Sequence, residues 1–266
     1  PKTVAISFSG VHSIAAGNFE NLPEILSNFN NNDLLCVRPS SESPDWGGPS
    51  AIMNIGMNNL RYEELKQKLG ADAASSIYIN FVQAYSLHVA RLDPDIFNPV
   101  ETQNSAALAK VLEIYENETE HEFPQDITKQ LSEILRSMAR TWESTTARLL
   151  RQAKGAPLDA GLGLVIQVMA FGLGEGECGT GTLQLIDEND GKPKIKGRYK
   201  EQSQIRPEKF SEGALYLTKD DRGLSLEDNN EEIFRQLFEF ATIMRLKLRE
   251  EMQIEFSIQN GILNIL

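Results

Sequence analysis

Strand-like and helix-like patterns occupy different stretches of this chain of 266 residues. Residues 1–60 combine short apolar runs with one helical stretch, and residues 161–266 hold further apolar runs separated by polar turns. Between them, residues 61–160 follow a helical period. This order is typical of an α+β protein. We therefore predict an N-terminal α/β lobe, a helical segment and a strand-rich lobe with these boundaries.

The helical period is clearest in a few stretches of the first 153 residues. They are Phe19–Phe29, Ala73–Leu92, Ser105–Glu116 and residues 126–153. In the last of these, which we predict as one continuous helix, an apolar stripe reaches Trp142, and Gly155 and Pro157 mark the end. A core position is the simplest interpretation of Trp142. A further helix is expected at Glu231–Glu250.

Apolar runs with strand character fall in the two outer parts of the chain. They cover Val4–Phe8, Leu34–Val37, Leu164–Phe171, Thr182–Ile186, Ile195–Tyr199 and the two arms of a C-terminal hairpin, Met252–Ile258 and Ile262–Leu266. The hairpin is predicted from alternation on both sides of Asn260-Gly261. The run that contains Gln167 has no other polar residue, which predicts a strand buried on both faces. Residues 187–191 are expected to form a turn.

Composition excludes several classes of function. A net charge of −12 argues against nucleic acid as a partner, because a phosphate backbone needs a basic face. No apolar run is long enough for a membrane span, and the first residues lack a secretory pattern. We therefore expect a cytoplasmic protein in which Cys36 and Cys178 are free thiols. The three histidines have no spacing typical of a metal site.

An arginine at the end of a strand-like run marks the first candidate site. Arg38 follows Leu34–Val37 and precedes a polar loop, residues 39–50, rich in serine, proline and glycine. Such a loop leaves backbone N–H groups available beside a fixed cation, which suits a phosphate. A short apolar helix is expected to follow the loop.

This region resembles the pyruvate phosphate dikinase family. Val37-Arg38 and the later block Met53-Asn54-Ile55-Gly56-Met57-Asn58 align without a gap on the family's Val-Arg-Ser-Gly-Ala and Leu-Asn-Leu-Gly-Leu-Asn. The resemblance implies a two-lobed, ATP-grasp-like nucleotide-binding domain with a helical insertion, formed by the whole chain. It also implies that Arg38 contacts the phosphates of ATP and acts in catalysis.

A second match surrounds Gln167 and Met169. Val-Ile-Gln-Val-Met-Ala-Phe-Gly here, followed by Gly179-Thr180-Gly181, is similar to the family's Val-x-Val-Gln-x-Met-Val-Phe-Gly and Ser-Gly-Thr-Gly-Val. The resemblance implies that these five residues contact the nucleotide, and small residues between strands would let backbone approach a ligand. Packing inside a β-core for Gln167 and Met169, and an ordinary hairpin for the glycines, are the alternatives.

The third match lies in the C-terminal hairpin. Ile-Glu-Phe-Ser-Ile-x-x-Gly-x-Leu, which includes Glu255, is similar to the family's Ile-Glu-Phe-Thr-Ile-x-x-Gly-x-Leu. The resemblance implies that Glu255 binds Mg²⁺, a cation that prefers hard oxygen ligands. Taken alone, Glu255 reads as a solvent-facing residue of a strand.

The chain also departs from the family pattern. Arg198 stands where the family has a glutamate, and the arginine expected near Ile186 is missing. Pro1 aligns just downstream of the family's Gly-Gly-Lys motif, and Leu266 aligns one residue before a glutamine that would be the second metal ligand. The phosphohistidine domain of the family has no counterpart here, so we expect no turnover from this chain alone.

Two functional hypotheses follow. In the first, the chain is the ATP- and Mg²⁺-binding domain of a dikinase-like phosphotransferase that phosphorylates a histidine on another domain or protein. In the second, the chain is a divergent, catalytically inactive nucleotide-binding or regulatory module of the same fold, and the departures favour this alternative. A scaffold that binds no nucleotide is a weaker third possibility.

Overall fold

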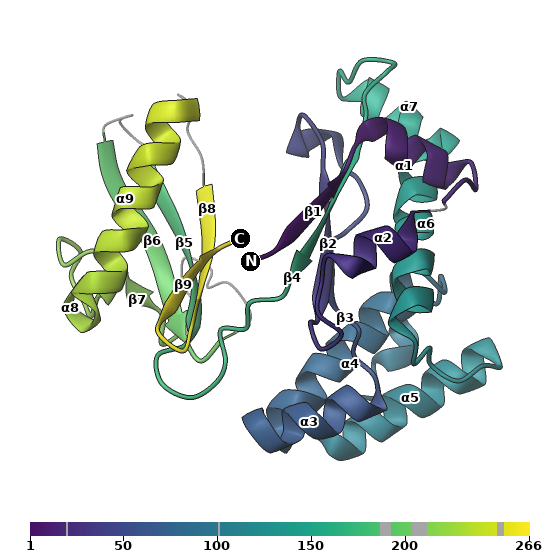
Figure 1. Ribbon diagram of the computed structural model, residues 1–266, viewed down its shortest axis with the longest axis horizontal. Coiled ribbons are helices and arrows are strands. Elements are labelled where there is room, and N and C mark those ends of the chain that lie inside the picture. The colour runs from purple at the N-terminus through teal and green to yellow at the C-terminus, as the bar shows by residue number, and fades with distance from the viewer. Residues whose placement is uncertain (20, 101, 187–192, 204–211, 249–252) are drawn as a thin grey trace. The chain divides into compact units, whose positions relative to one another are not determined.

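Two antiparallel sheets, built from different parts of the chain, organise the fold (Figure 1). The structure is a computed structural model and describes residues 1–266 except 20, 101, 187–192, 204–211 and 249–252. The chain divides into an N-terminal unit, residues 2–169, and a C-terminal unit, residues 170–266 with Pro1. Helices together with antiparallel sheets confirm the predicted α+β class.

The N-terminal unit contains a four-stranded sheet and the helices that cover one of its faces. Its elements are β1 (Thr3–Ile6), α1 (Phe8–Ala15), α2 (Leu22–Ser27), β2 (Leu35–Ser40), β3 (Ile52–Ile55), α3 (Asn59–Leu69), α4 (Ala71–His88), α5 (Ser105–Thr119), α6 (Ile127–Glu143), α7 (Thr145–Ala153) and β4 (Gly163–Val168). The strand order is β1-β4-β2-β3. The last strand along the chain therefore lies inside the sheet, between β1 and β2.

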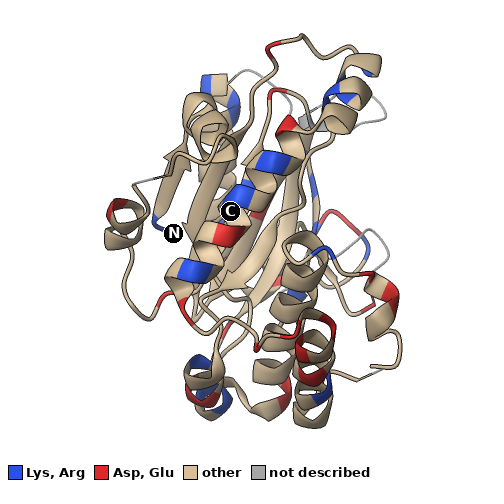
Figure 2. Ribbon diagram, turned by 90° about the vertical axis from the view of Figure 1, so that its right-hand side faces the viewer, with Lys and Arg blue, Asp and Glu red and all other residues tan. Residues whose placement is uncertain are grey.

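Helix α6 supplies much of the core that covers this sheet. Its buried stripe includes Leu131, Ile134, Leu135 and Met138 and ends at Trp142, which is 1% exposed and confirms the predicted core position. The outward side of the helix is charged, and Figure 2 shows α6 in front of the sheet with basic segments along it. The helix is therefore strongly amphipathic.

A buried amide ties α6 to two loops. Gln130, which is fully buried, accepts a hydrogen bond from the backbone N–H of Gly56 (2.8 Å). Its amide nitrogen donates to the carbonyl oxygens of Met57 (3.0 Å) and Pro124 (2.6 Å). One side chain thus satisfies three backbone groups, two at the adjacent residues Gly56 and Met57 and one at the distant Pro124.

The helical part has its own aromatic core. Phe123, in the segment before α6, lies 5.1–5.9 Å, centroid to centroid, from the rings of Tyr78, Phe81, Tyr85 and Tyr115. All four contacts are edge-to-face, an arrangement that the ring quadrupole favours. One ring therefore joins α4 and α5 to the start of α6.

The C-terminal unit is a five-stranded sheet with a long helix on one face (Figure 1). Its elements are β5 (Gly179–Ile186), β6 (Pro193–Glu201), β7 (Leu215–Tyr216), α8 (Leu226–Asn229), α9 (Glu231–Leu248), β8 (Gln253–Gln259) and β9 (Ile262–Ile265), in the strand order β7-β6-β5-β8-β9. Ile233, Leu237 and Ala241 of α9 share a buried cluster with Leu183 and Phe256 of the sheet.

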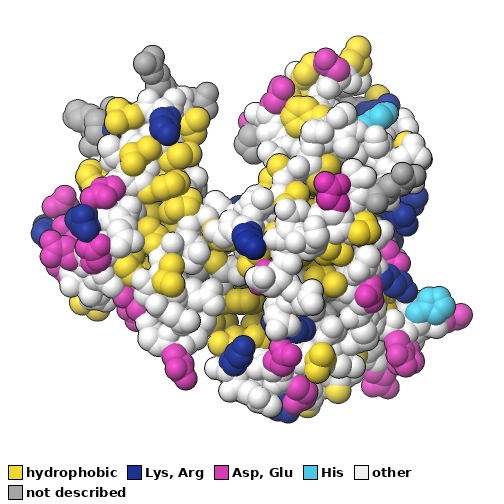
Figure 3. Space-filling view, in the orientation of Figure 1, with side chains coloured by type: hydrophobic (Ala, Val, Ile, Leu, Met, Phe, Trp, Pro, Cys, Tyr) yellow, Lys and Arg dark blue, Asp and Glu magenta, His cyan; other side chains and the backbone are white. Residues whose placement is uncertain are grey.

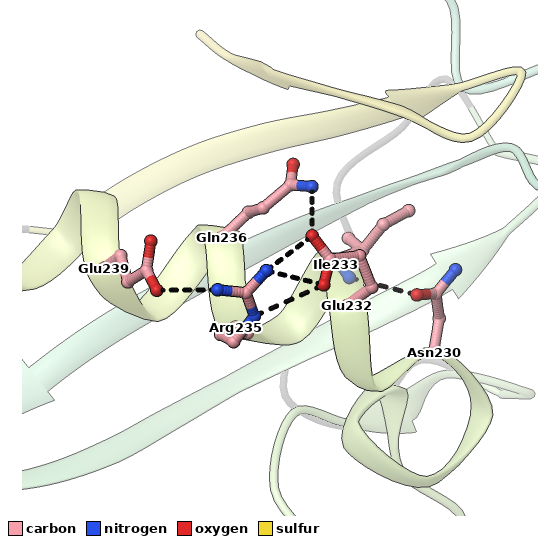
Figure 4. Close-up of polar contacts among 6 residues, drawn as sticks. All are labelled: Asn230, Glu232, Ile233, Arg235, Gln236 and Glu239. Atoms are coloured by element: carbon pink, nitrogen blue, oxygen red, sulfur yellow. Dashed lines mark hydrogen bonds and ion pairs between the residues drawn. The ribbon is translucent and has the colours of Figure 1, made fainter.

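Helix α9 begins at a cap and carries a charged ladder (Figure 4). Asn230 accepts a hydrogen bond from the N–H of Ile233 (3.0 Å), which satisfies one donor of the first turn. Arg235 bridges Glu232 (2.7 Å) and Glu239 (3.1 Å) on the solvent side. Apolar side chains also reach the surface of this unit (Figure 3), among them Phe238 and Leu246 of α9.

The expected helix after the Arg38 loop is wrong, because residues 52–55 form strand β3. Ile52 pairs with Val37 and Ile55 pairs with Leu35, and both isoleucines are fully buried. Asn54 and Gly56 have φ angles of 64° and 98°, which a right-handed helix excludes. Burial against β2 therefore decides the conformation of this apolar stretch.

Three further expectations need correction. The helix predicted over 126–153 is broken at Ser144, which has an extended backbone and whose hydroxyl accepts from the N–H of Ala147 (3.3 Å), capping α7. Strand β4 is not buried on both faces, because Val165 and Gln167 are half-buried while Leu164 and Ile166 on the other face are buried. The first strand ends at Ile6, so that Phe8 begins a helix.

Other expectations are met or fall outside the described residues. The C-terminal hairpin is present as β8 and β9, and the helix expected over 231–250 is α9. The helix expected over 19–29 is shorter, Leu22–Ser27. The predicted turn at 187–191 lies outside the described residues, as does Met252. Cys36 and Cys178 are free and buried. Helices within the described residues are too short or too polar to cross a membrane.

We expect Gln130→Leu to destabilise the protein by about 2–5 kcal/mol, because three backbone groups lose their partner in a buried site. Urea unfolding followed by circular dichroism measures the loss. Gln152→Leu, an exposed position on α7, is the matched control and should change stability by less than about 0.5 kcal/mol. A loss for Gln130→Leu no larger than that of the control would contradict the bridging role.

Candidate functional site

Arg38 and Gln167 lie on one face of the N-terminal sheet. Cys36 of β2 pairs with Gln167 of β4, and Arg38 pairs with Val165. Because side chains alternate along a strand, these four residues share the face opposite the buried Leu164 and Ile166 of β4. Arg38 and Gln167 are diagonal neighbours, a relation that spans about 7–8 Å. We call this side the open face of the N-terminal sheet.

The structure fixes how Gln167 and Met169 are held. The amide nitrogen of Gln167 donates to the hydroxyl of Thr3 on β1 (3.1 Å), so its side chain is oriented by the neighbouring strand. Met169 follows β4, and its N–H donates to the carbonyl oxygen of Leu34 (2.8 Å), which extends the pairing with β2. Both side chains are half-buried, so neither belongs to the closed core behind the sheet.

Arg38 lies within a strand rather than in the loop. Strand β2 continues to Ser40, and the loop that follows includes a short 3₁₀ helix at Pro44–Trp46. In that loop Gly48 packs against Trp142, because an added Cβ would lie 3.4 Å from the indole ring. Burial raises the pKa of the Cys36 thiol, and the charge of Arg38 offsets only part of this effect. The thiol beside the arginine is therefore protonated at neutral pH and no nucleophile.

The C-terminal sheet has an apolar face under α9 and a polar face on its other side. Strand register places Thr180 opposite Lys200 and Ser257, and Thr182 opposite Arg198 and Glu255. The polar face so defined carries Lys196, Arg198 and Lys200 on β6, Thr180, Thr182 and Gln184 on β5, Gln253, Glu255 and Ser257 on β8, and Asn264 on β9. From this set, the sequence indicated only Thr180 and Glu255 as site residues, and Arg198 as a departure from the family pattern.

The charges on the polar face are ordered across the strands. Basic residues occupy β6, uncharged hydroxyl and amide groups occupy β5, and the acid Glu255 occupies β8. Two strand spacings, about 9–10 Å, separate the basic column from the carboxylate. A polyanion on β5 would therefore lie between cations on one side and a carboxylate on the other, and a cation held by that carboxylate would relieve the repulsion.

One end of the polar face is buried and includes a hydroxyl group without a hydrogen-bond partner among the described residues. Thr180 is 4% exposed and Ser257 is fully buried. The hydroxyl of Ser257 has no hydrogen-bond partner among the described residues. A buried polar group without a partner is uncommon, and it commonly marks a place where a ligand or water binds.

The glycines at 179 and 181 serve packing. They lie within β5, not in a loop before it, so the expected start of this strand at Thr182 is wrong. A Cβ on Gly181 would lie 2.3 Å from the ring of Phe256, and one on Gly179 would lie 2.5 Å from the ring of Tyr199. Those two rings are stacked, 6.1 Å apart, on the apolar face. Of the Gly-Thr-Gly motif, only the Thr180 side chain points to the polar face.

The glycine-rich loop itself precedes β5 and is held by a glutamine. The side chain of Gln202 accepts from the N–H of Gly174 (3.3 Å) and donates to the carbonyl oxygens of Gly174 (3.1 Å) and Gly176 (3.3 Å). Both glycines have positive φ. Strands β4 and β5 belong to different sheets, so the ordinary hairpin considered for these glycines is excluded.

Arg198, which replaces the family's glutamate, has a structural role. Its guanidinium lies 4.2 Å from the centre of the Tyr216 ring and donates to the carbonyl oxygen of Ala214 (2.7 Å). Both partners come from the β7 region, so the arginine fastens the edge strand to β6. An acid at this position could make neither contact.

Glu255 is the one carboxylate on the polar face. Among the described residues no cluster of three or more histidine, cysteine or acidic side chains gathers around it or elsewhere. Asn264, on the adjacent strand, donates through its amide nitrogen to the carbonyl oxygen of Ile262 (3.2 Å). That hydrogen bond does not use the amide oxygen of Asn264. Such a donor set fits Mg²⁺, which uses one or two protein oxygens together with phosphate and water.

We expect Gly181→Ala to destabilise the chain by about 1–3 kcal/mol through overpacking against Phe256. In a Phe256→Leu background the same change should cost less, with a coupling of at least about 0.5 kcal/mol. Urea unfolding of the two single variants and the double variant gives this coupling. If Gly181→Ala lowers the free energy of unfolding equally in both backgrounds, contact with the Phe256 ring is not the reason for a glycine at position 181.

Curated pyruvate, phosphate dikinases are similar to most of this chain. The chain is 24% identical over 248 residues to pyruvate, phosphate dikinase of Clostridium symbiosum, 27% over 245 residues to the chloroplastic enzyme of Flaveria trinervia and 24% over 266 residues to that of Rickettsia conorii. These matches cover 86–91% of this chain and 25–30% of the relatives, so the chain spans less than a third of their length. No family model matches. The resemblance is confirmed: most of this chain is similar to one segment of the pyruvate, phosphate dikinases.

Proposed function

We propose that this chain is the ATP-binding domain of a dikinase-like phosphotransferase. In this proposal a phosphoryl group passes from ATP to a histidine on another domain or protein, so that a P–O bond breaks as a P–N bond forms. The named relatives are pyruvate phosphate dikinases, and this chain matches a minor part of each. The proposal includes the two-lobed ATP-grasp-like fold that the resemblance implies.

The observation that carries the proposal is the ordered polar face of the C-terminal sheet. A chain of net charge −12 places three basic residues side by side on β6 and one acid, Glu255, two strands away. The register brings Thr180, Thr182 and Gln184 between them. Phosphoryl transfer depends on positioning and charge neutralisation more than on covalent help from the protein, and this face supplies both.

Individual residues then take distinct roles. Arg38 offers a planar guanidinium that can contact two phosphate oxygens at once, and strand pairing fixes the backbone from which it extends. Gln167 and Met169, at the end of β4, would contact the base or sugar. Glu255 would hold Mg²⁺, which when bound neutralises phosphate charge. Lys196 and Lys200 join this set because the register places them on the same face as Thr180.

The alternative, a divergent module that binds nucleotide without transfer, has a specific observation in its favour. Arg198 is committed to Tyr216 and Ala214 at a position where the family has an acid. A role for that acid in transfer would be lost here, whereas binding through Arg38 and the β6 lysines would remain. The two functions differ in whether a histidine becomes labelled, not in whether ATP binds.

We expect ATP with Mg²⁺ to bind the chain with micromolar affinity and Arg38→Ala to weaken binding at least about tenfold, since a charge-assisted contact to phosphate is lost. Arg38→Lys should fall between, because it keeps the charge but not the planar fork. Calorimetric titration measures all three. Arg235→Ala, on the solvent side of α9, is the matched control (Figure 4). Equal affinity in Arg38→Ala and the control would reject the arginine as a ligand.

We expect Glu255→Gln to remove most of the Mg²⁺ dependence of ATP binding, because a neutral amide is a poor substitute for a carboxylate at Mg²⁺. Titrations with and without Mg²⁺ give the ratio of the two dissociation constants for each variant. Glu239→Gln is the control for loss of one negative charge elsewhere in this unit. A ratio unchanged from the unaltered chain would remove Glu255 from the metal site.

A labelling experiment separates transfer from binding alone. The chain is incubated with labelled ATP, Mg²⁺ and a histidine-bearing domain taken from a pyruvate phosphate dikinase. Acid-labile label on the histidine domain would support phosphotransfer. Binding of ATP without label would support the inactive module.

A further inference from the structure

A cavity in the helical part of the N-terminal unit is rimmed by arginines. It lies between α4, α5 and α6, has a volume of about 550 Å³, and is lined by Tyr85, Arg91, Glu133, Arg136 and Arg140 among others. None of these is among the residues proposed to contact ATP. The volume lies within the range of small-molecule sites.

Two of the arginines have no carboxylate partner among the residues that the structure describes. Arg136 and Arg140 lie one turn apart on the outward face of α6 and make no ion pair within the described part of the chain. The chain has 38 acidic residues against 26 basic ones, so partners are abundant. Like charges four residues apart on a helix repel each other, which destabilises the helix. An anion bound between Arg136 and Arg140 would remove this repulsion.

The third arginine is directed to the same face. Arg91 follows α4 with a left-handed backbone, φ 62°. Its guanidinium donates to the hydroxyls of Thr141 (2.7 Å) and Ser137 (3.3 Å) on α6. Arg91, Arg136 and Arg140 all line the cavity, so three guanidinium groups border one site.

The cavity also carries one acid, which is bound to a tyrosine. Tyr85 donates its hydroxyl proton to the carboxylate of Glu133, and burial followed by that carboxylate raises the pKa of Tyr85. Glu133 is the only acid that lines the cavity as described, against three arginines, so a surplus of two positive charges remains.

We propose that this cavity binds a small dianion of the phosphomonoester class, with the phosphate held by Arg136 and Arg140. A phosphomonoester carries close to two negative charges at neutral pH and presents three acceptor oxygens, which matches the charge surplus and the convergent guanidinium groups. The remaining volume, towards Tyr85 and Tyr115, accommodates the organic part of the molecule. The site is independent of the proposed nucleotide site, and either can fail alone.

Calorimetric titration of the full chain with glycerol 3-phosphate, and with glycerol as the uncharged probe, tests this assignment. We expect binding of glycerol 3-phosphate only. Arg136→Gln and Arg140→Gln should each weaken it at least about tenfold. Both side chains are exposed, so both variants should fold, as circular dichroism will confirm. Lys129→Gln, an exposed lysine on the same helix outside the cavity, should leave binding unchanged.

Two further variants fix the location and the sign of the effect. Glu133→Gln should tighten binding several-fold, since it removes the one opposing charge and keeps an acceptor for Tyr85. Arg38→Ala should have no effect. Absence of binding at millimolar concentration, or weakening by Arg38→Ala but not by Arg140→Gln, would overturn the proposal. Succinate that binds as tightly as glycerol 3-phosphate would overturn the assignment to phosphomonoesters.

Discussion

The register of β4 between β1 and β2 is the constraint on which the N-terminal half of the candidate site depends. Cys36 opposite Gln167 and Arg38 opposite Val165 put the polar side chains on the open face and Leu164 and Ile166 in the core. A slip of one residue would exchange the two faces and bury the glutamine. Because Leu164 and Ile166 would then leave the core, the register that buries the core is also the register that presents Arg38.

The same logic of alternating faces explains the C-terminal unit. Residues 254, 256 and 258 of β8 pack under α9, so 255 and 257 must lie on the other face. Gly181 is small because the ring of Phe256 lies where its side chain would be. On the apolar face, the glycines of β5 therefore lie between Tyr199 of β6 and Phe256 of β8. Thr180, between those glycines, points to the polar face. Core and site are two sides of one sheet.

Much of this could be predicted from the sequence, and some could not. The amphipathic stripe of α6 and the Asn260-Gly261 hairpin follow from local periodicity and turn chemistry. Strand β3 was predicted as helix because Ile52 and Ile55 are also compatible with a helical period, and only burial against Leu35 and Val37 decides between them. The arginine-rimmed cavity had no signal, since Arg91 and Arg140 are distant in sequence.

The sequence by itself determined the α+β class, the main helices and strands, and the motifs around Arg38, Gln167, Thr180 and Glu255 that relate this chain to a segment of the dikinases. The secondary structure follows from local patterns, and the motifs are short runs of residues that can be matched to a family from the sequence alone. Tertiary structure alone decided which residues share a face: that Gly179 and Gly181 serve packing, that Arg198 fastens β7 through Tyr216, and that Lys196 and Lys200 stand beside Thr180. The reason is physical, because strand pairing joins residues far apart in sequence, and their neighbours are set by register and burial rather than by local pattern.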